Sequence, residues 1–235
     1  MTEVAKVTPP GGPANPLARH ATRVAVGMYL KMADVRTVRT AGRAGLDFVR
    51  IDMCHGVSDP AAVRTLTEAA HEAGLRVSVR VPKSDDAIAA AVRAGAESLT
   101  FPSVDSAQDA TRLCGLVGPG PLVSVQIESA SGLRNLDGIA RTPGVGMLQC
   151  GRADLSRDLR LPDRSLQALR RYDEQVFATA RAAEILFCLH APPGTGQYGA
   201  EWLARGADCL TLGADTQMIA AMLQQSMEGL LAMGK

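Results

Sequence analysis

The chain has 235 residues, 46% of them hydrophobic and 21% charged, which is enough to bury one sizeable core and argues against a second domain. Its formal net charge of +1, with Lys and Arg spread along the chain, excludes the electrostatic footprint of a nucleic-acid or anionic-lipid binder. No apolar run approaches the roughly 20 residues of a membrane helix. We therefore expect a small-molecule partner, with no nucleic acid and no membrane.

Cysteine usage and the beginning of the chain both bear on location. The cysteines are odd in number and lack CxxC spacing, namely Cys54, Cys114, Cys150, Cys188 and Cys209. Reduced thiols in predicted core strands pack like small hydrophobic groups. The first residues lack the apolar core of a signal peptide. These features predict a cytoplasmic location.

The first 20 residues differ in composition from the rest of the chain. Residues 8–16 are rich in Pro and Gly, which cannot sustain a ladder of backbone hydrogen bonds. We therefore predict a flexible tail over residues 1–20, with partial docking on the folded part left open. Residues 21–235 are then the catalytic domain.

After the tail, short apolar runs alternate with longer segments of helical period. Eight runs are predicted as strands, at residues 23–27, 48–52, 75–80, 98–101, 122–128, 145–150, 185–189 and 209–213. Ala-rich segments such as 61–73, 85–94 and 164–183 are predicted as helices. Glycines follow several helices and suit a left-handed C-terminal turn, namely Gly45, Gly74, Gly95 and Gly206. Repeated units of this kind predict a single α/β (β/α)8 TIM barrel, with a doubly wound open sheet as the alternative.

Polar residues follow the predicted strands where a barrel would gather them at one rim. Glu128 ends the fifth strand, and Asp154 lies just after the sixth. Two carboxylates at one rim can chelate a hard divalent cation, so a metal-dependent enzyme is the leading hypothesis. Asp52, His55 and Arg80 extend the same rim.

Structural readings of these residues stay open. A carboxylate at a strand end can be a helix N-cap or an ion-pair partner. Arg80 can pair with a rim carboxylate, and His55 can be a loop residue. Asp85 can be the N-cap of a helix that begins near Asp86. His190, followed by Pro192-Pro193-Gly194, is read as part of a structured loop.

Several short motifs, in this order and spacing, resemble the HpcH/HpaI aldolase family of metal-dependent class II pyruvate aldolases. The motifs are Asp52-Met53-Cys54-His55, Val79-Arg80-Val81-Pro82 with Asp85, Phe101-Pro102-Ser103-Val104, Val125-Gln126-Ile127-Glu128, the Gly-x-Ala-Asp-Leu-Ser run from Gly151, and Leu212-Gly213-Ala214-Asp215-Thr216. The resemblance runs from about Val24 to the C-terminus. It implies a barrel of the phosphoenolpyruvate/pyruvate-domain type.

The resemblance also implies a metal site and a charge-stabilising group. Glu128 and Asp154 would hold Mg²⁺ or Mn²⁺, with Co²⁺ as a further option. Arg80 would face the oxygen on which negative charge develops, and Gln126 would add a hydrogen bond beside it. The cation and the guanidinium would then act on the same α-keto acid.

Two further roles follow from the resemblance. His55 would be the base, acting through a water molecule and oriented by Asp52 and by Asp85 of a neighbouring subunit. The backbone N–H groups of Gly151, Arg152, Ala153 and Asp154, which open a helix, would bind the substrate carboxylate.

This chain departs from the family pattern in three places. Cys54 stands where the family usually has Glu before the histidine, and Arg152 replaces a proline and would place a cation near the carboxylate-binding amides. A long segment between the fourth helix and the fifth strand is missing, because residues 113–121 connect them almost directly. We expect a more open pocket, or one covered by the Pro-rich tail or by loop 191–199.

The resemblance predicts a carbon–carbon lyase. The expected reaction is the reversible aldol cleavage or condensation of a 4-hydroxy-2-oxo acid through a pyruvate-type enolate, with an aldehyde or ketone as second reactant. An oxaloacetate-like decarboxylase and a citrate-lyase β-like acyl-CoA lyase are enzymatic alternatives. A non-catalytic ligand-binding barrel is an alternative of another class.

The C-terminal segment predicts self-association. Residues 217–233 form a helical pattern with apolar residues at Met218, Ile219, Met222, Leu223, Met227, Leu230 and Leu231. Packing on the chain's own barrel is the alternative. The family resemblance implies exchange of this helix between subunits and a homo-oligomer, from dimer to hexamer.

Overall fold

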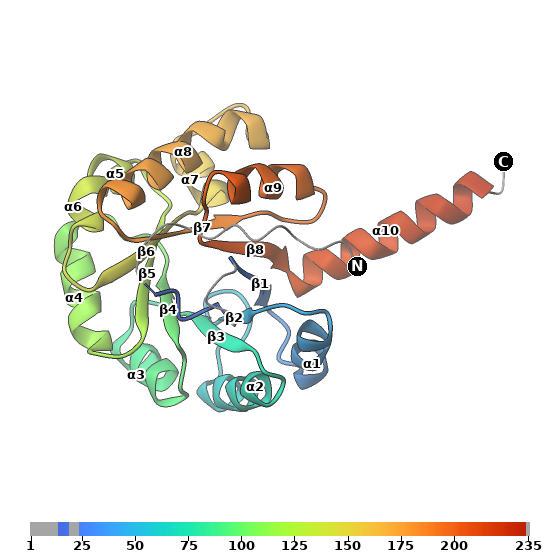
Figure 1. Ribbon diagram of the computed structural model, residues 1–235, viewed down its shortest axis with the longest axis horizontal. Helices are drawn as coiled ribbons and strands as arrows, with labels where there is room; N and C mark the ends of the chain where they lie inside the picture. The colour runs from blue at the N-terminus through green and yellow to red at the C-terminus, as the bar shows by residue number, and fades with distance from the viewer. Residues whose placement is uncertain (1–13, 19–23, 234–235) are drawn as a thin grey trace.

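The computed structural model describes residues 14–18 and 24–233. Eight parallel strands pair in chain order, and β1 pairs with β8, so the sheet closes into a barrel with helices around it (Figure 1). The strands are β1 Ala25–Leu30, β2 Phe48–Asp52, β3 Arg76–Arg80, β4 Ser98–Phe101, β5 Leu122–Ile127, β6 Val145–Cys150, β7 Leu186–His190 and β8 Cys209–Ala214. The predicted TIM barrel is confirmed, and the open sheet is excluded.

The helices follow the strands in the alternation that the sequence pattern predicts. They are α1 Val35–Arg43, α2 Pro60–Glu72, α3 Asp85–Arg93, α4 Ala107–Val117, α5 Ala130–Arg134, α6 Leu136–Ala140, α7 Arg152–Asp158, α8 Leu166–Ala182, α9 Gly196–Ala204 and α10 Asp215–Met233. The four glycines expected to end helices all have positive φ, from 71° at Gly74 to 94° at Gly206. No helix within residues 24–233 is long and apolar enough to cross a bilayer.

The first strand differs from the prediction. Gly27 suggested the end of the strand, but β1 continues to Leu30. A Cβ at Gly27 would lie 2.5 Å from the carbonyl oxygen of Phe48, so this glycine permits a close approach of β1 to β2 instead of a turn. The longer strand carries Tyr29 to the rim where the functional residues gather.

The other strand boundaries differ by one residue at most. β5 ends at Ile127, so Glu128 is the first residue beyond the strand. β7 runs from Leu186 to His190, which places His190 in the strand and corrects its assignment to a loop. α4 ends at Val117 and β5 begins at Leu122, as expected for the shortened connection.

Residues 14–18 lie at the N-terminal end of the strands. Leu17 is fully buried and packs with Phe48, Leu186 and Cys209, each at the start of its strand. The Asn15 side chain donates a hydrogen bond to the carbonyl oxygen of Asp208, at 3.0 Å. This part of the predicted tail therefore closes the base of the barrel and does not cover the opposite end. The other residues of the predicted tail lie outside the described residues.

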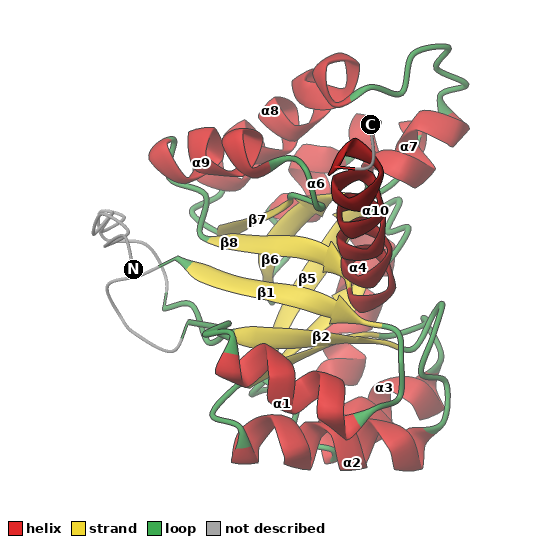
Figure 2. Ribbon diagram, turned by 90° about the vertical axis from the view of Figure 1, so that its right-hand side faces the viewer, coloured by secondary structure: helices red, strands yellow, loops and turns green. Residues whose placement is uncertain are grey.

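Helix α10 projects from the barrel instead of lying along it (Figures 1 and 2). Its large apolar side chains are exposed, from 48% at Ile219 to 69% at Leu230. Met218 alone is partly buried against the core cluster. The alternative in which this helix packs on its own barrel is therefore wrong.

Candidate active site

A cavity of about 820 Å³ opens at the C-terminal ends of the strands. The structure brings to it every predicted site residue except Asp85, namely Asp52, His55, Arg80, Gln126, Glu128, Gly151, Arg152, Ala153 and Asp154. This is the end of a parallel barrel at which side chains from different strands converge. The cavity is also lined by residues that the sequence did not single out, including Tyr29, Lys31 and Gln149.

One side of the cavity is built around Asp52, which is completely buried at the end of β2. Its carboxylate accepts hydrogen bonds from Arg80 Nε at 2.9 Å and from Nη2 at 2.7 Å. The backbone N–H groups of Cys54 and His55 donate to the same carboxylate, at 3.0 and 3.1 Å. Burial lowers the pKa of Arg80, but its hydrogen bonds with Asp52 and the negative charges possible at Tyr29, Asp52 and Cys54 together raise that pKa above its ordinary value. Arg80 is therefore a fixed cation.

The imidazole of His55 contacts Arg80. Its Nδ1 contacts Arg80 Nη2 and lies 4.0 Å from a carboxylate oxygen of Asp52. A guanidinium only donates hydrogen bonds, so Nδ1 accepts and the ring proton is on Nε2. The side chain is 61% exposed. His55 is thus oriented by Arg80 and open to solvent, as a base acting through water requires.

The other side of the cavity is built around Glu128. Ser103 donates to its Oε2 from both the backbone N–H, at 3.1 Å, and the hydroxyl, at 3.0 Å. Ser103 has a φ of 52°, a strained conformation that aims both donors at this oxygen. Burial raises the pKa of Glu128, and the nearby charge of Asp154 raises it further. The protein thus holds a buried carboxylate beside another carboxylate.

Gly151 leaves room for Glu128. A Cβ at position 151 would lie 2.4 Å from Glu128 Oε1 and 2.3 Å from its Cγ, so a side chain there would displace the carboxylate. The proline expected by the family pattern is replaced at the next position by Arg152, the first residue of α7. The absence of a side chain at Gly151 is therefore required for the Glu128 carboxylate to lie next to α7, the helix that carries Asp154.

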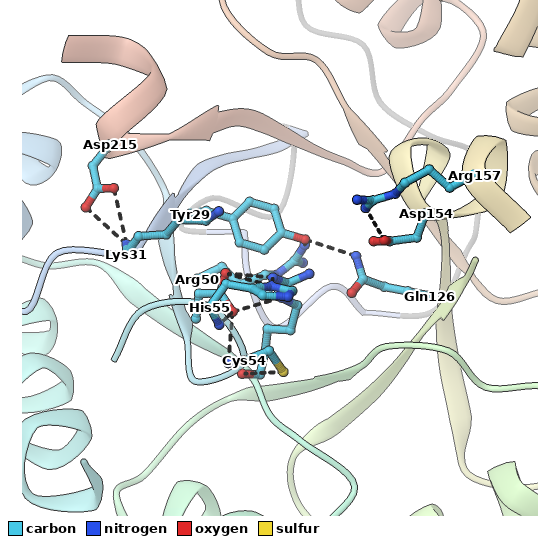
Figure 3. A network of polar contacts seen from close by, with 11 residues as sticks. Tyr29, Lys31, Arg50, Cys54, His55, Gln126, Asp154, Arg157 and Asp215 are labelled. Atoms are coloured by element: carbon cyan, nitrogen blue, oxygen red, sulfur yellow. Dashed lines mark hydrogen bonds and ion pairs between the residues drawn. The ribbon is translucent and has the colours of Figure 1, made fainter. Parts of the chain in front are cut away.

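Asp154 lies in the first turn of α7 and forms an ion pair with Arg157 (Figure 3). No cluster of three or more His, Cys, Asp or Glu side chains suited to a metal occurs within residues 14–18 and 24–233. Any cation held by Glu128 and Asp154 must therefore complete its coordination with water and substrate oxygens. Arg157 competes with such a cation for Asp154.

The Arg152 side chain has a different role from the one expected. It is buried, pairs with Asp173 of α8 and donates to the carbonyl oxygen of His190. Tyr198 donates to the same Asp173 carboxylate at 2.6 Å. Arg152 therefore fastens α7 to α8 and to the end of β7, and its charge is neutralised by Asp173 instead of facing a substrate carboxylate. Its backbone N–H remains in the first turn of α7.

The N-cap alternative for Asp85 is wrong, whereas its predicted role toward His55 of a neighbouring subunit stays a prediction. Asp85 is exposed at the first position of α3, 3.5 Å from Arg112, and lies away from the cavity of its own chain. Ser84, not Asp85, is the N-cap of that helix. Burial raises the pKa of Cys54 to about 11, so its thiol stays protonated and does not replace the glutamate that the family has there.

His190 is a cavity residue that the sequence analysis set aside. Burial lowers its pKa to about 3, with the charges of Arg152 and Arg50 adding to the effect. Its Nδ1 lies 3.2 Å from the hydroxyl of Thr211, and its ring lies edge-on to Tyr29. The imidazole is therefore neutral at physiological pH. Because two prolines follow it, the sequence suggested a loop.

The sequence matches a known protein family. A model of the HpcH/HpaI aldolase/citrate lyase family matches residues 25–221. The chain belongs to that family. Its members are pyruvate-type class II aldolases, so the predicted class, a carbon–carbon lyase, is confirmed at the level of the family.

Relatives agree with this assignment, and a solved structure agrees with the fold. The chain is 28% identical to the hydroxypyruvate/pyruvate aldolase of Agrobacterium fabrum, over 88% of this chain and 89% of the relative. It is also 28% identical to the 4-hydroxy-2-oxovalerate aldolase of Rhodococcus jostii, over 84% and 88% respectively. The crystal structure of citrate synthase SbnG is similar in fold, with a TM-score of 0.81, 24% identity and coverage of 90% and 94%.

Proposed function

We propose that this protein catalyses the reversible aldol cleavage of a 4-hydroxy-2-oxo acid into a pyruvate-type oxo acid and an aldehyde or ketone. The observation that supports this most is the placement of Glu128. It is a buried carboxylate next to Asp154, in one cavity with the fixed cation Arg80. Such a site suits a divalent cation and the developing negative charge of an enolate.

The donor set fits Mg²⁺ or Mn²⁺. Both are hard cations that prefer carboxylate oxygens, and a cation would offset the burial and the repulsion by Asp154, which together raise the pKa of Glu128. Glu128 and Asp154 would hold it, and the glycine at position 151 leaves space for their oxygens. When bound, the cation supplies a Lewis acid that draws electrons from the oxo acid.

The protein's own groups then bind and activate the substrate. Arg80 uses Nε and Nη2 on Asp52, which leaves Nη1 for the oxygen of the forming enolate. The first-turn N–H groups of α7, from Arg152 to Asp154, have no acceptor within the helix and suit the substrate carboxylate. His55 Nδ1 accepts from Arg80 Nη2 in the structure, so it takes the proton of the 4-hydroxyl group through a water molecule only when this contact opens.

The test is hydrogen exchange at the methyl group of pyruvate, followed by NMR in deuterated buffer with Mg²⁺. A pyruvate aldolase exchanges these hydrogens without a second reactant, because enolate formation alone suffices. Exchange followed by condensation with an aldehyde panel supports the proposal. Binding of pyruvate without exchange would instead identify a non-catalytic barrel. Turnover of oxaloacetate or an acyl-CoA alone would identify the decarboxylase or the acyl-CoA lyase.

We also propose that the protein is a homo-oligomer in which α10 packs on a second copy. The support is the row of exposed apolar side chains on a helix that leaves its own barrel. Light scattering should give a dimer or larger assembly for the wild type, and a smaller one for the double variant Leu223→Glu, Leu230→Glu. An unchanged mass for that variant would contradict this assignment.

The five free cysteines support the proposed cytoplasmic location.

A further inference from the structure

The hydroxyl group of Tyr29 has an unused hydrogen. Gln126 Nε2 donates to it at 3.1 Å, and Arg50 Nη1 donates to it at 3.3 Å (Figure 3). Both neighbours are donors, so the Tyr29 oxygen accepts twice and its own O–H is not engaged by either of them. Tyr29 is only 8% exposed and lines the cavity. The floor of the cavity therefore offers a free hydrogen-bond donor.

Next to this donor is a free acceptor. Gln126 is 5% exposed, and its Oε1 is buried and has no hydrogen-bond partner among the described residues. Leaving a buried polar atom unpaired costs about 1–3 kcal/mol, so such an atom at a cavity wall indicates a ligand group. Because its Nε2 is bound to Tyr29, the free donor and the free acceptor lie side by side.

Arg50 strengthens the donor. It is completely buried under the cavity, and it donates to Ser78 at 3.1 Å, Gln149 at 2.8 Å, Tyr29, and the sulfur of Cys188 at 3.9 Å. None of these described contacts is a carboxylate. A cation that donates to a hydroxyl oxygen polarises its O–H bond, which then donates more strongly. Arg50 is thus a positioning residue for Tyr29.

A free donor beside a free acceptor matches a group that is both acceptor and donor. An enolate or carboxylate oxygen would satisfy Tyr29 but would face the lone pairs of Gln126 Oε1. A hydroxyl group satisfies both, because it accepts from Tyr29 and donates to Gln126. The cation–π contact of Arg80 with the Tyr29 ring, at 5.4 Å, places this pair beside the proposed reaction centre.

We propose that Tyr29 and Gln126 together bind a hydroxyl group of the substrate, so that Tyr29 is a further catalytic residue that determines specificity. The hydroxyl belongs to the oxo acid itself, as in a 3-hydroxy-2-oxo acid, because the hydroxyl at the carbon where the aldol bond breaks gives its one hydrogen to the water that leads to His55. This inference rests on the proposed aldolase function, and it makes no covalent step.

The experiment compares Tyr29→Phe with the wild-type protein, both loaded with Mg²⁺. Phenylalanine keeps the ring against Arg80 and His190 and removes only the hydroxyl. Calorimetry gives the dissociation constants of hydroxypyruvate and pyruvate, which differ by one hydroxyl. The cleavage of a 4-hydroxy-2-oxo acid gives kcat and KM. Tyr172→Phe is the matched control, because that hydroxyl contacts only Arg171 among the described residues.

A loss of about 5- to 20-fold in affinity for hydroxypyruvate, with pyruvate unchanged, supports a hydroxyl on the oxo acid. Unchanged binding of both, with a loss in kcat/KM for cleavage, would place the effect at the aldol carbon and overturn the assignment. Gln126→Met should show the same selective loss. Equal losses for pyruvate and hydroxypyruvate, or no change in any of these measurements, would overturn the assignment.

The failure of this inference is distinguishable from the failure of the proposed function. Exchange of the pyruvate methyl hydrogens by the wild type tests the function without any contribution from a substrate hydroxyl. Wild-type exchange with no selective effect of Tyr29→Phe rejects only the hydroxyl site. Absence of wild-type exchange rejects the proposed function and this inference with it.

Discussion

On one side of the cavity, Asp52 is buried with its counterion, whereas on the other side Glu128 is buried without one. Asp52 receives two bonds from Arg80 and two from backbone N–H groups. Among residues 14–18 and 24–233, Glu128 accepts hydrogen bonds from Ser103 alone, and the charge that shifts its pKa most is that of another carboxylate, Asp154, ahead of the opposing charge of Arg80. Burial of an ion is costly unless a partner compensates. The Asp52 side is therefore complete within the protein, whereas the Glu128 side has no cationic side chain paired with it in the described part of the chain.

The largest effect is expected when the charge of Glu128 is removed. Glu128→Gln keeps the shape of the side chain but is a poor ligand, so Mg²⁺-dependent exchange of pyruvate hydrogens should fall by about 10³-fold or more. Without metal, the same variant should melt at a higher temperature than the wild type, because no charge is buried. Glu68→Gln, on the exposed face of α2, is the control. Full activity of Glu128→Gln would contradict the comparison.

On the side of Asp52, a substitution should instead lower the stability of the folded protein. Asp52→Asn leaves the buried guanidinium of Arg80 without its counterion, and we expect a loss of about 3–5 kcal/mol in the free energy of unfolding. Urea denaturation measures this loss. Asp86→Asn, on the exposed first turn of α3, should change the free energy by less than about 0.5 kcal/mol. Equal stabilities of Asp52→Asn and the wild type would show that the pair is not a structural unit.

His190 is a buried group that stays neutral, so it makes the stability of the protein depend on pH. Its pKa is about 3 in the folded protein and 6.5 ordinarily. As pH falls below 6.5, the unfolded chain binds a proton that the folded protein does not, so stability is lost with falling pH. Between pH 6.5 and pH 5 the loss should be about 2 kcal/mol. In urea denaturation, His190→Asn should lack this part of the pH dependence. Identical pH slopes would refute the burial argument.

The smallest expected effect concerns Arg157, which pairs with Asp154 on the incomplete side. Arg157→Gln removes a competitor for the carboxylate, so the affinity for Mn²⁺ should rise by about 2- to 5-fold, as expected for an exposed ion pair worth less than about 1 kcal/mol. Titration followed by electron paramagnetic resonance measures the free Mn²⁺. Arg134→Gln, at the end of α5, is the control. A weaker affinity in Arg157→Gln would indicate that Arg157 supports the cation site.

The barrel could be predicted from the sequence because its signals are local. Apolar runs of about five residues, helical segments and glycines at helix ends each depend on near neighbours in the chain. The local pattern was misleading at Gly27, which was predicted to end the first strand. Glycine is needed there because a Cβ would clash with the carbonyl oxygen of Phe48 on the neighbouring strand. A contact between strands leaves no mark in the local pattern.

The candidate site was predictable in part for the same reason. Glu128, Asp154, Asp52, Arg80 and His55 lie at or just after strand ends, where the barrel must gather them. The partner of Arg152 could not be predicted, because Asp173 lies 21 residues further along the chain on a helix. Nor could the role of Tyr29, which depends on two donors from other strands and on the true length of β1.

We propose that Glu128 and Asp154 hold a divalent cation. Diffraction at the manganese absorption edge, from crystals grown with Mn²⁺, tests it most directly. We predict an anomalous peak between the two carboxylates, at about 2.1–2.2 Å from their nearest oxygens, with Arg157 displaced from Asp154. A cavity without a peak at this position, or a peak held by other residues, would contradict the account.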